Sequence, residues 1–206
     1  MNGITDAQLA VLASLAGKLD AGTYLAGGVA LATAYGHRSS FDLDLFVAAD
    51  FDAERLAEHV TASVPRAIVT GRAPRTLHLE VDGVPTSILS YRYPLLRALE
   101  HRPGLPIAVA SMDDLACMKV SAIAGRGAAK DFWDLDVILE HGAAGGDLPG
   151  VLERYGRKFA SEDIGHAVRA LAYFADADAA PLPAGLAPAH WKRLKASFAA
   201  RVRALE

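Results

Sequence analysis

The chain has 206 residues, 52% of them hydrophobic, and a formal net charge of −3. This length and apolar content predict one domain, or one domain with an appended helical region. The weak negative charge excludes nucleic-acid binding through a global basic field, so any such contact needs a local basic patch. The single cysteine, Cys117, excludes an intramolecular disulfide and fits a reducing cytoplasm. We expect Cys117 to be a small buried residue on a helix.

The first part of the chain mixes helical and extended patterns. Apolar residues recur at helical spacing over residues 5–20, where Thr5 or Asp6 is the expected N-cap. The elements expected next are a strand over 23–26, a helix over 28–36 closed by Gly36, a strand over 41–47, an amphipathic helix over 52–64 and a short strand over 66–71.

Residues 76–91 predict a β-hairpin. Asp82-Gly83 stands between two alternating segments, which is typical of a two-residue turn. Its register pairs Val81 with Val84, Leu79 with Thr86 and Leu77 with Ile88 on one mostly apolar face, and Glu80 with Pro85 and His78 with Ser87 on the other. Because Pro85 lacks an N–H group, its strand is expected to be an edge there or distorted.

The remainder is predominantly helical. A short helix is expected over 94–101 and a short strand over 106–110, before a helix that Ser111 caps. Further helices are expected over 130–141, 151–159, 161–175 and 188–205, with a flexible loop over 142–150 and a Pro/Ala-rich linker over 176–188. The order predicts an α+β fold, with a small mixed sheet flanked by helices in residues 1–110 and a helical C-terminal region, 111–206, packed on that core.

The strongest chemical signal is a glycine pair followed by an aspartate pair. Gly27 and Gly28 precede a helical run and would offer backbone N–H groups to a phosphate. Asp42 and Asp44 are two apart on an expected strand, so both carboxylates face one side while the intervening leucine faces the core. Converging aspartates are hard-oxygen ligands suited to Mg²⁺. The two features together predict phosphoryl or nucleotidyl transfer.

These residues carry a resemblance to a known family. Gly27-Gly28, thirteen residues and then Asp42-Leu-Asp44 resemble the signature of the DNA polymerase β-type nucleotidyltransferase superfamily. The longer pattern Gly-Gly-x-Ala-Leu, then Gly-His-Arg-x-Ser-x-Asp-x-Asp-x-Phe, is similar to the AbiEii/AbiGii family of nucleotidyltransferase-like abortive-infection toxins. A second motif of that family resembles Ser111-x-x-Asp114-Leu-x-x-x-Lys119 followed by Arg126-Gly-x-x-Lys130-Asp131-x-x-Asp134-Leu135.

The resemblance implies a nucleotidyltransferase fold and Mg²⁺-dependent transfer of a nucleoside monophosphate from an NTP to an acceptor. One acceptor that it implies is the 3′ end of a tRNA, modified by a toxin encoded beside a cognate antitoxin. It assigns Asp42 and Asp44 to the metal and Gly27 and Gly28 to the triphosphate turn. The other implied roles are loop support or phosphate contact for Arg38 and Ser39 or Ser40, triphosphate contact for Lys119, and substrate contact or a structural salt bridge for Lys130 and Asp131.

Two positions depart from the family pattern. Val29 stands where many members have Thr, and Ser87 stands where a third carboxylate is expected. That carboxylate would help to hold the metal and could take the proton of the attacking hydroxyl. Glu80 lies on the same predicted face as Ser87, one strand over, and could supply it as a third catalytic acid. His78 shares that face and is expected to line the site or the surface.

Other functions stay open at this point. If Glu80 does not complete the site, the chain could bind nucleotide or a protein partner with little or no turnover. A further possibility is transfer to a small molecule, as in relatives of the fold that modify aminoglycoside antibiotics. We find no signal-peptide pattern and no apolar run of the roughly 20 residues that a membrane span needs, so we expect a cytoplasmic protein without a membrane partner.

Overall fold

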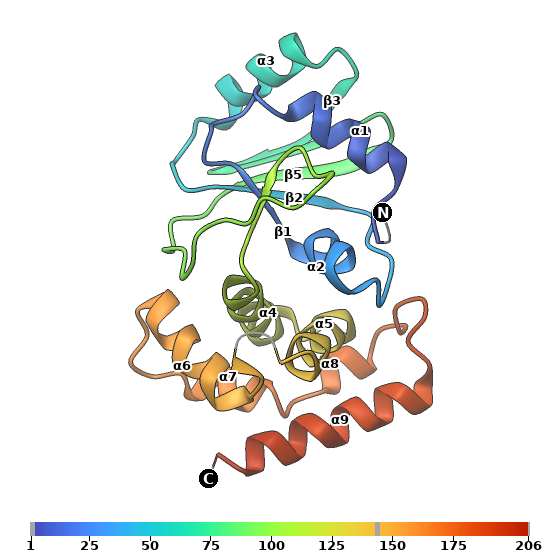
Figure 1. The fold of residues 1–206 in the computed structure, drawn as a ribbon, viewed down its shortest axis with the longest axis vertical. Helices are drawn as coiled ribbons and strands as arrows, with labels where there is room; N and C mark the ends of the chain where they lie inside the picture. Colours follow the sequence, from blue (N-terminus) through green and yellow to red (C-terminus); the bar gives the residue numbers. More distant parts are fainter. Residues whose placement is uncertain (1–2, 143–144, 206) are drawn as a thin grey trace. The chain divides into compact units, whose positions relative to one another are not determined.

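The computed structural model describes residues 3–142 and 145–205 (Figure 1). The chain divides into two compact units, Met1–Ser111 and Met112–Glu206. The described part of the first unit contains helices and a mixed sheet, and the described part of the second consists of helices and their connections. The α+β class and the helical C-terminal region predicted from the sequence are therefore confirmed.

The first unit is built around one sheet. Among the described residues, six strands are arranged in the order β3-β4-β5-β2-β1-β6. β1 pairs antiparallel with β2 and parallel with β6, and β2 pairs parallel with β5. The elements are α1 (Asp6–Leu15), β1 (Tyr24–Ala26), α2 (Gly27–Tyr35), β2 (Leu43–Val47), α3 (Ala53–Ser63), β3 (Ala67–Ala73), β4 (Thr76–Val81), β5 (Val84–Ser90) and β6 (Ala108–Val109).

The two faces of this sheet differ in character. Helices α1 and α3 cover one face, and α2 lies on the other side (Figure 1). Along β2, Leu43 and Leu45 are fully buried while Asp44 and Phe46 are half-buried on the opposite face. Each fully buried leucine contributes on the order of 1.5–3 kcal/mol through removal of its side chain from water. The alternation therefore fixes which face carries the aspartates.

The predicted hairpin is confirmed, register included. Val81 pairs with Val84 around the Asp82-Gly83 turn, where the φ angles of 51° and 78° are those of a turn with both central residues left-handed. β5 is an inner strand of the sheet, but its pairing with β2 starts only at Thr86. Pro85 therefore stands where an N–H group is not required by the ladder, and the local edge predicted from the proline is correct.

Two expectations for the first unit were wrong. Residues 94–101 form bends and a β-bridge instead of a helix, because Glu100 exchanges backbone hydrogen bonds of 2.8 Å with Val109. The first helix ends at Leu15 rather than near residue 20. Gly17 follows with a φ of 73°, which takes the chain out of the right-handed helical region. Long-range pairing and a glycine turn prevail over helical periodicity at these places.

The second unit consists of α4 (Met112–Arg126), α5 (Ala129–Glu140), α6 (Leu148–Phe159), α7 (Gly165–Ala170), α8 (Ala175–Asp178) and α9 (Pro188–Arg203). The single helix expected over 161–175 is thus replaced by two short ones. The loop expected over 142–150 includes residues 143–144, which lie outside the described residues, and α6 begins within it behind the N-cap Asp147.

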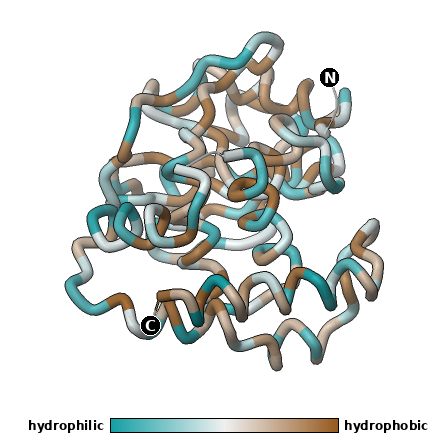
Figure 2. The backbone as a smooth tube through the Cα atoms, turned by 60° about the horizontal axis from the view of Figure 1, so that its bottom comes forward, coloured by the Kyte–Doolittle hydropathy of each residue, from teal (hydrophilic) through white to brown (hydrophobic). Residues whose placement is uncertain are grey.

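An aromatic cluster forms part of the core of this helical unit. Phe132 of α5 contacts the rings of Phe174, Trp191 and Phe198 at centroid distances of 5.3–5.7 Å. Hydrophobic and hydrophilic residues alternate along the backbone in Figure 2. On α9 the buried residues Trp191, Leu194 and Phe198 lie at helical spacing and form one stripe.

A buried ion pair joins α4 to α6. Lys158 Nζ lies 2.6 Å from Asp114 Oδ1, and both side chains are fully buried. Cys117 is buried on α4, and its burial raises the pKa of its thiol to about 12. The thiol is therefore neutral and unreactive, which confirms the expected packing role.

We predict that Asp136→Asn stabilises the chain, and more so as pH rises. Burial, with a smaller contribution from Glu140, raises the pKa of Asp136 to about 6. Above that pH the folded state must hold a buried carboxylate, so stability is lost as pH rises from the unfolded pKa through 6. Urea unfolding should show a gain that grows between pH 4 and pH 7.5 to about 2 kcal/mol. The exposed Glu153→Gln is the control; an equal gain at every pH would contradict this account.

Candidate active site

The turn between β1 and α2 brings the helix start against Asp44. Ala26 and Asp44 are direct partners across the antiparallel pair β1–β2. Gly27 follows with a φ of 68°, and a Cβ built on it would overlap Asp44 Oδ2. Glycine is thus required at position 27 for two reasons: the backbone is left-handed there, and the Asp44 carboxylate approaches closely. This explains the first residue of the glycine pair.

The start of α2 is arranged to hold an anion. Its N-cap is Ala26, whose methyl group can accept no hydrogen bond, and its first turn is Gly-Gly-Val-Ala. A Cβ on Gly28 would overlap Ser40 Oγ and would lie 2.7 Å from Arg38 Nη2. A guanidinium, a hydroxyl and the positive end of a helix therefore converge on the second glycine.

Asp44 lies against this cradle, and Asp42 precedes Asp44 by two residues. Asp42 is exposed immediately before β2, and Asp44 is half-buried on it. Leu43, between them, is fully buried, so the two carboxylates belong to the opposite face. Ser39 is exposed, and its carbonyl accepts a hydrogen bond of 3.0 Å from Arg38 Nη1, which supports the loop. The structure thus brings together the glycine pair, Arg38, Ser40 and Asp44, while Asp42 belongs to the same face two residues earlier.

Gln8 is a supporting residue that the sequence interpretation missed. Its buried amide donates to the carbonyl oxygens of Ser40 and Phe41 at 2.8 and 3.1 Å, and its Oε1 accepts from the Thr5 N–H at 2.9 Å. One side chain therefore closes the capping box of α1 and fixes the loop that leads to Asp42. The pattern Thr5-x-x-Gln8 was a visible signal for the cap, but not for the loop contact.

Arg102 supports the cradle from the other side. Its Nη1 donates to the Ala30 carbonyl oxygen of α2 at 3.0 Å, and its Nη2 pairs with Glu100 Oε2 at 2.8 Å. The segment that was expected to be helical instead holds this arginine against α2. It thereby fixes the helix whose first turn forms the cradle.

Ser87 and His78 extend the aspartate face of the sheet. Ser87 is the direct partner of Asp44 across β2–β5, and His78 is the direct partner of Ser87 across β4–β5. The His78 ring nitrogen Nδ1 lies 2.9 Å from Ser87 Oγ. The sequence placed these side chains on one face, and the structure adds the hydrogen bond between them.

Glu80 is placed away from the aspartates. Glu80 is on β4 and pairs with Pro85 of β5, which lies between β4 and β2. Two strand spacings, roughly 10 Å, therefore separate Glu80 from the strand that carries Asp44. Within residues 3–142 and 145–205, three or more Asp, Glu, His or Cys side chains nowhere form a group that could hold a metal. This arrangement therefore does not gather Glu80 into a three-carboxylate cluster, and its catalytic role stays a prediction.

The three remaining predicted residues belong to the second unit. Lys119 is buried, with Nζ 3.0 Å from Asp131 Oδ1 and 2.7 Å from Asp134 Oδ2, and Arg126 binds Asp131 at 2.7 Å. Burial alone would raise the pKa of Asp131, but the Lys119 ammonium and Arg126 guanidinium outweigh it and lower that pKa below its usual range. Lys130 is exposed. Asp131 thus forms the structural salt bridge that was one of its two expected roles, with Lys119 and Arg126.

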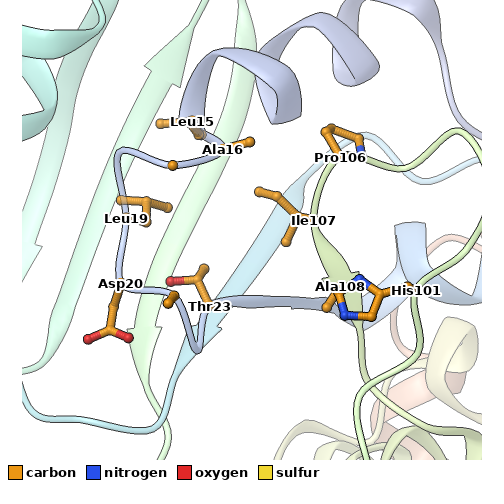
Figure 3. Close-up of a pocket in the computed structure, with 11 residues that line it drawn as sticks. Leu15, Ala16, Leu19, Asp20, Thr23, His101, Pro106, Ile107 and Ala108 are labelled. Atoms are coloured by element: carbon orange, nitrogen blue, oxygen red, sulfur yellow. The ribbon is translucent and has the colours of Figure 1, made fainter.

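A separate cavity of about 320 Å³ lies at the opposite end of β1 (Figure 3). Its walls include the apolar residues Leu15, Leu19 and Ile107, together with Thr23, which directly precedes β1. Gly27 follows the other end of that strand, so this cavity and the anion cradle are different features. No helix in the described parts of the chain is both long and apolar enough to cross a membrane.

Comparison with known proteins identifies the class. A family model described as nucleotidyl transferase AbiEii toxin, type IV TA system, matches residues 67–205, which is more than half of the chain. The chain belongs to this family, and it is a nucleotidyltransferase. The matched span begins at β3, so the glycine pair and the two aspartates precede it.

Relatives in sequence and structure agree with this assignment. An uncharacterised protein of Aquifex aeolicus (strain VF5) is 38% identical over 156 residues, which cover 75% of this chain and 74% of the relative. The nucleotidyltransferase toxin MenT4 of Mycobacterium tuberculosis H37Rv is similar with a TM-score of 0.63 at 18% identity, over 97% of this chain and 82% of its own. JHP933 of Helicobacter pylori gives 0.57 at 17% identity, over 95% and 87%. The predicted nucleotidyltransferase fold is confirmed.

We predict that Gly27→Ala weakens the binding of metal and nucleotide. The new Cβ must displace the Asp44 carboxylate, whereas Gly17→Ala adds a Cβ at a similar φ of 73° where it meets no described atom within 4 Å. Both variants should lose on the order of 1 kcal/mol of stability through backbone strain. Calorimetric titration with Mn²⁺ and a non-hydrolysable NTP should show at least a tenfold loss of affinity for Gly27→Ala and no loss for Gly17→Ala. Equal affinities for the two variants would count against the Asp44 contact.

We predict that Gln8→Leu loosens the loop before Asp42. It removes two hydrogen bonds to loop carbonyls, which should cost about 1–3 kcal/mol of stability. Thr5→Ala breaks the capping box but leaves the Gln8 amide on the loop, and it is the matched control. Hydrogen exchange over residues 36–42 should accelerate in Gln8→Leu and stay unchanged in Thr5→Ala; unchanged exchange in both would refute the bracing role.

Proposed function

We propose that this nucleotidyltransferase uses Mg²⁺ to transfer a nucleoside monophosphate from an NTP to the 3′ end of a tRNA, as the toxin of a toxin–antitoxin pair. The observation that supports the proposal is the contact geometry at Gly27, where the start of α2 lies directly against Asp44. Phosphate cradle and metal ligands therefore belong to one site.

The residues present fit Mg²⁺. This ion favours six oxygen ligands and is usually held by one or two carboxylates together with substrate phosphates and waters. Asp42 and Asp44 would provide the two carboxylates, and phosphates in the cradle of α2 would complete the set. Such a site does not need the third carboxylate that the family resemblance led us to expect. When bound, Mg²⁺ would neutralise charge that develops on the transferred phosphate.

The chain's own groups then hold the substrate for reaction. Arg38, Ser40 and the first N–H groups of α2 bind and orient the triphosphate. An acceptor hydroxyl attacks the α-phosphorus in line, a new P–O bond forms, and the bond to the β-phosphate oxygen breaks with release of pyrophosphate. Rate enhancement comes from this positioning and from preorganised positive charge.

The acceptor and the partner rest on the family. Its description as a type IV toxin–antitoxin toxin supports a cognate antitoxin. For tRNA, the net charge of −3 requires a local basic surface, and Lys192, Arg193 and Arg203 are exposed on α9. We propose a cytoplasmic location, where tRNA and NTPs occur together and where the buried thiol of Cys117 is compatible with the redox state.

We predict transfer of label from one or more α-³²P-NTPs to total tRNA in the presence of Mg²⁺. Asp42→Asn and Asp44→Asn should each lower the rate at least 100-fold, because the neutral amides bind the metal far more weakly than carboxylates do. Asp6→Asn, on the exposed first turn of α1, should leave the rate unchanged. Prior periodate oxidation of the tRNA 3′ end should abolish labelling.

Other outcomes would redirect the proposal. Label on an aminoglycoside but not on tRNA would establish the small-molecule transferase instead. Folded protein that transfers no label to any acceptor, but binds NTP, would indicate the module without turnover.

A further inference from the structure

Three polar residues form one row across three neighbouring strands. Asp44 on β2 is paired with Ser87 on β5, and Ser87 is paired with His78 on β4. Directly paired residues project from the same face of a sheet, and adjacent strands are about 5 Å apart. Ser87 is therefore the nearest polar side chain of β5 to the Asp44 carboxylate position, with His78 directly behind it.

The His78 ring is held in a defined place. Its Nδ1 lies 2.9 Å from Ser87 Oγ on one side. On the other side a β-bulge between Val69 and Gly71 puts Gly71 across from it, and a Cβ at Gly71 would lie 3.4 Å from His78 Cδ2. The backbone of the edge strand at Gly71 thus lies beside the imidazole. Serine and histidine in this arrangement form a hydrogen-bonded pair beside a metal ligand.

An attacking hydroxyl must lose a proton, and the row offers a path for it. We infer that Ser87 accepts the proton of the acceptor hydroxyl and passes its own proton to Nδ1 of His78. The O–H bond of the acceptor breaks as its oxygen bonds to the α-phosphorus, the Ser87 hydroxyl is regenerated, and His78 leaves the step as an imidazolium. Ser87 contacts the reacting hydroxyl, and His78 is a positioning residue that acts through it. This inference rests on the proposed nucleotidyl transfer.

The charges around His78 favour this direction of transfer. Glu80 lies two residues along β4 on the same face, and Asp44 lies two strands away in the same row. The facing residues Ser87 and Gly71, on β5 and β3, are neutral. The Glu80 carboxylate therefore lies on the face that would carry the imidazolium, whereas the Asp44 carboxylate would be occupied by the metal ion. Glu80 contributes here through its charge, without binding the metal.

The relay predicts a specific pattern among four variants. His78→Gln and Ser87→Ala should each lower kcat for labelling of tRNA by about 100-fold or more, the usual contribution of general base catalysis, while KM for NTP stays within twofold. Ser87→Asp places a carboxylate beside Asp44 that can take the proton itself. It should keep kcat within about tenfold of the parent, and adding His78→Gln to it should cost less than threefold. The exposed His101→Gln is the matched control and should leave kcat unchanged.

A second readout separates proton transfer from binding or folding. Calorimetric titration with Mn²⁺ and a non-hydrolysable NTP should give the same affinity for His78→Gln as for the parent, and thermal unfolding should confirm that each variant is folded. If His78→Gln leaves the transfer rate unchanged, the relay is overturned but the proposed function stays intact. The same holds if His78→Gln causes an equal loss of rate whether residue 87 is Ser or Asp. A parent without any transfer activity overturns both.

Discussion

The absence of a side chain at position 27 is the constraint on which the first unit depends. The register of β1 and β2 places Asp44 opposite Ala26, and the chain then turns at a φ of 68° into α2. Any larger residue would collide with the Asp44 carboxylate. The positive end of a helix, which attracts phosphate, and a carboxylate, which attracts a metal, are thereby held in contact. A nucleotide with its metal ion, the ligand proposed above, would satisfy both.

The surrounding structure can be understood as support for that contact. Gln8 joins α1 to the loop before Asp42. Arg102, in the irregular segment after β5, donates a hydrogen bond to the Ala30 carbonyl oxygen of α2. The second unit has its own means of support, a buried pair of Lys158 with Asp114 and a buried cluster around Lys119. Such buried charges tolerate the loss of one partner poorly, so they fix the positions of α4, α5 and α6.

Local signals predicted much of this arrangement. The alternation in β2, the Asp82-Gly83 turn, the Gly36 cap and the aspartate face all follow from rules that involve neighbouring residues, and the structure confirms them. What sequence could not provide was long-range partnership. The bridge of Glu100 with Val109, the reach of Gln8 over more than thirty residues and the pairing of Lys119 with two aspartates each depend on packing that no periodicity encodes. The row of Asp44, Ser87 and His78 was predictable only in part. The hairpin register gave the pairing of His78 with Ser87, but the pairing of Ser87 with Asp44 on β2 is a long-range contact that the sequence did not indicate.

The most direct test of the central claim is a crystal structure of the protein with Mn²⁺ and a non-hydrolysable NTP. Anomalous scattering locates the metal independently of any assumption about its ligands. We expect Mn²⁺ to bind the carboxylates of both Asp42 and Asp44, with the phosphates against the first turn of α2 beside Arg38 and Ser40. Phosphates bound elsewhere, or a metal that contacts neither aspartate, would contradict it.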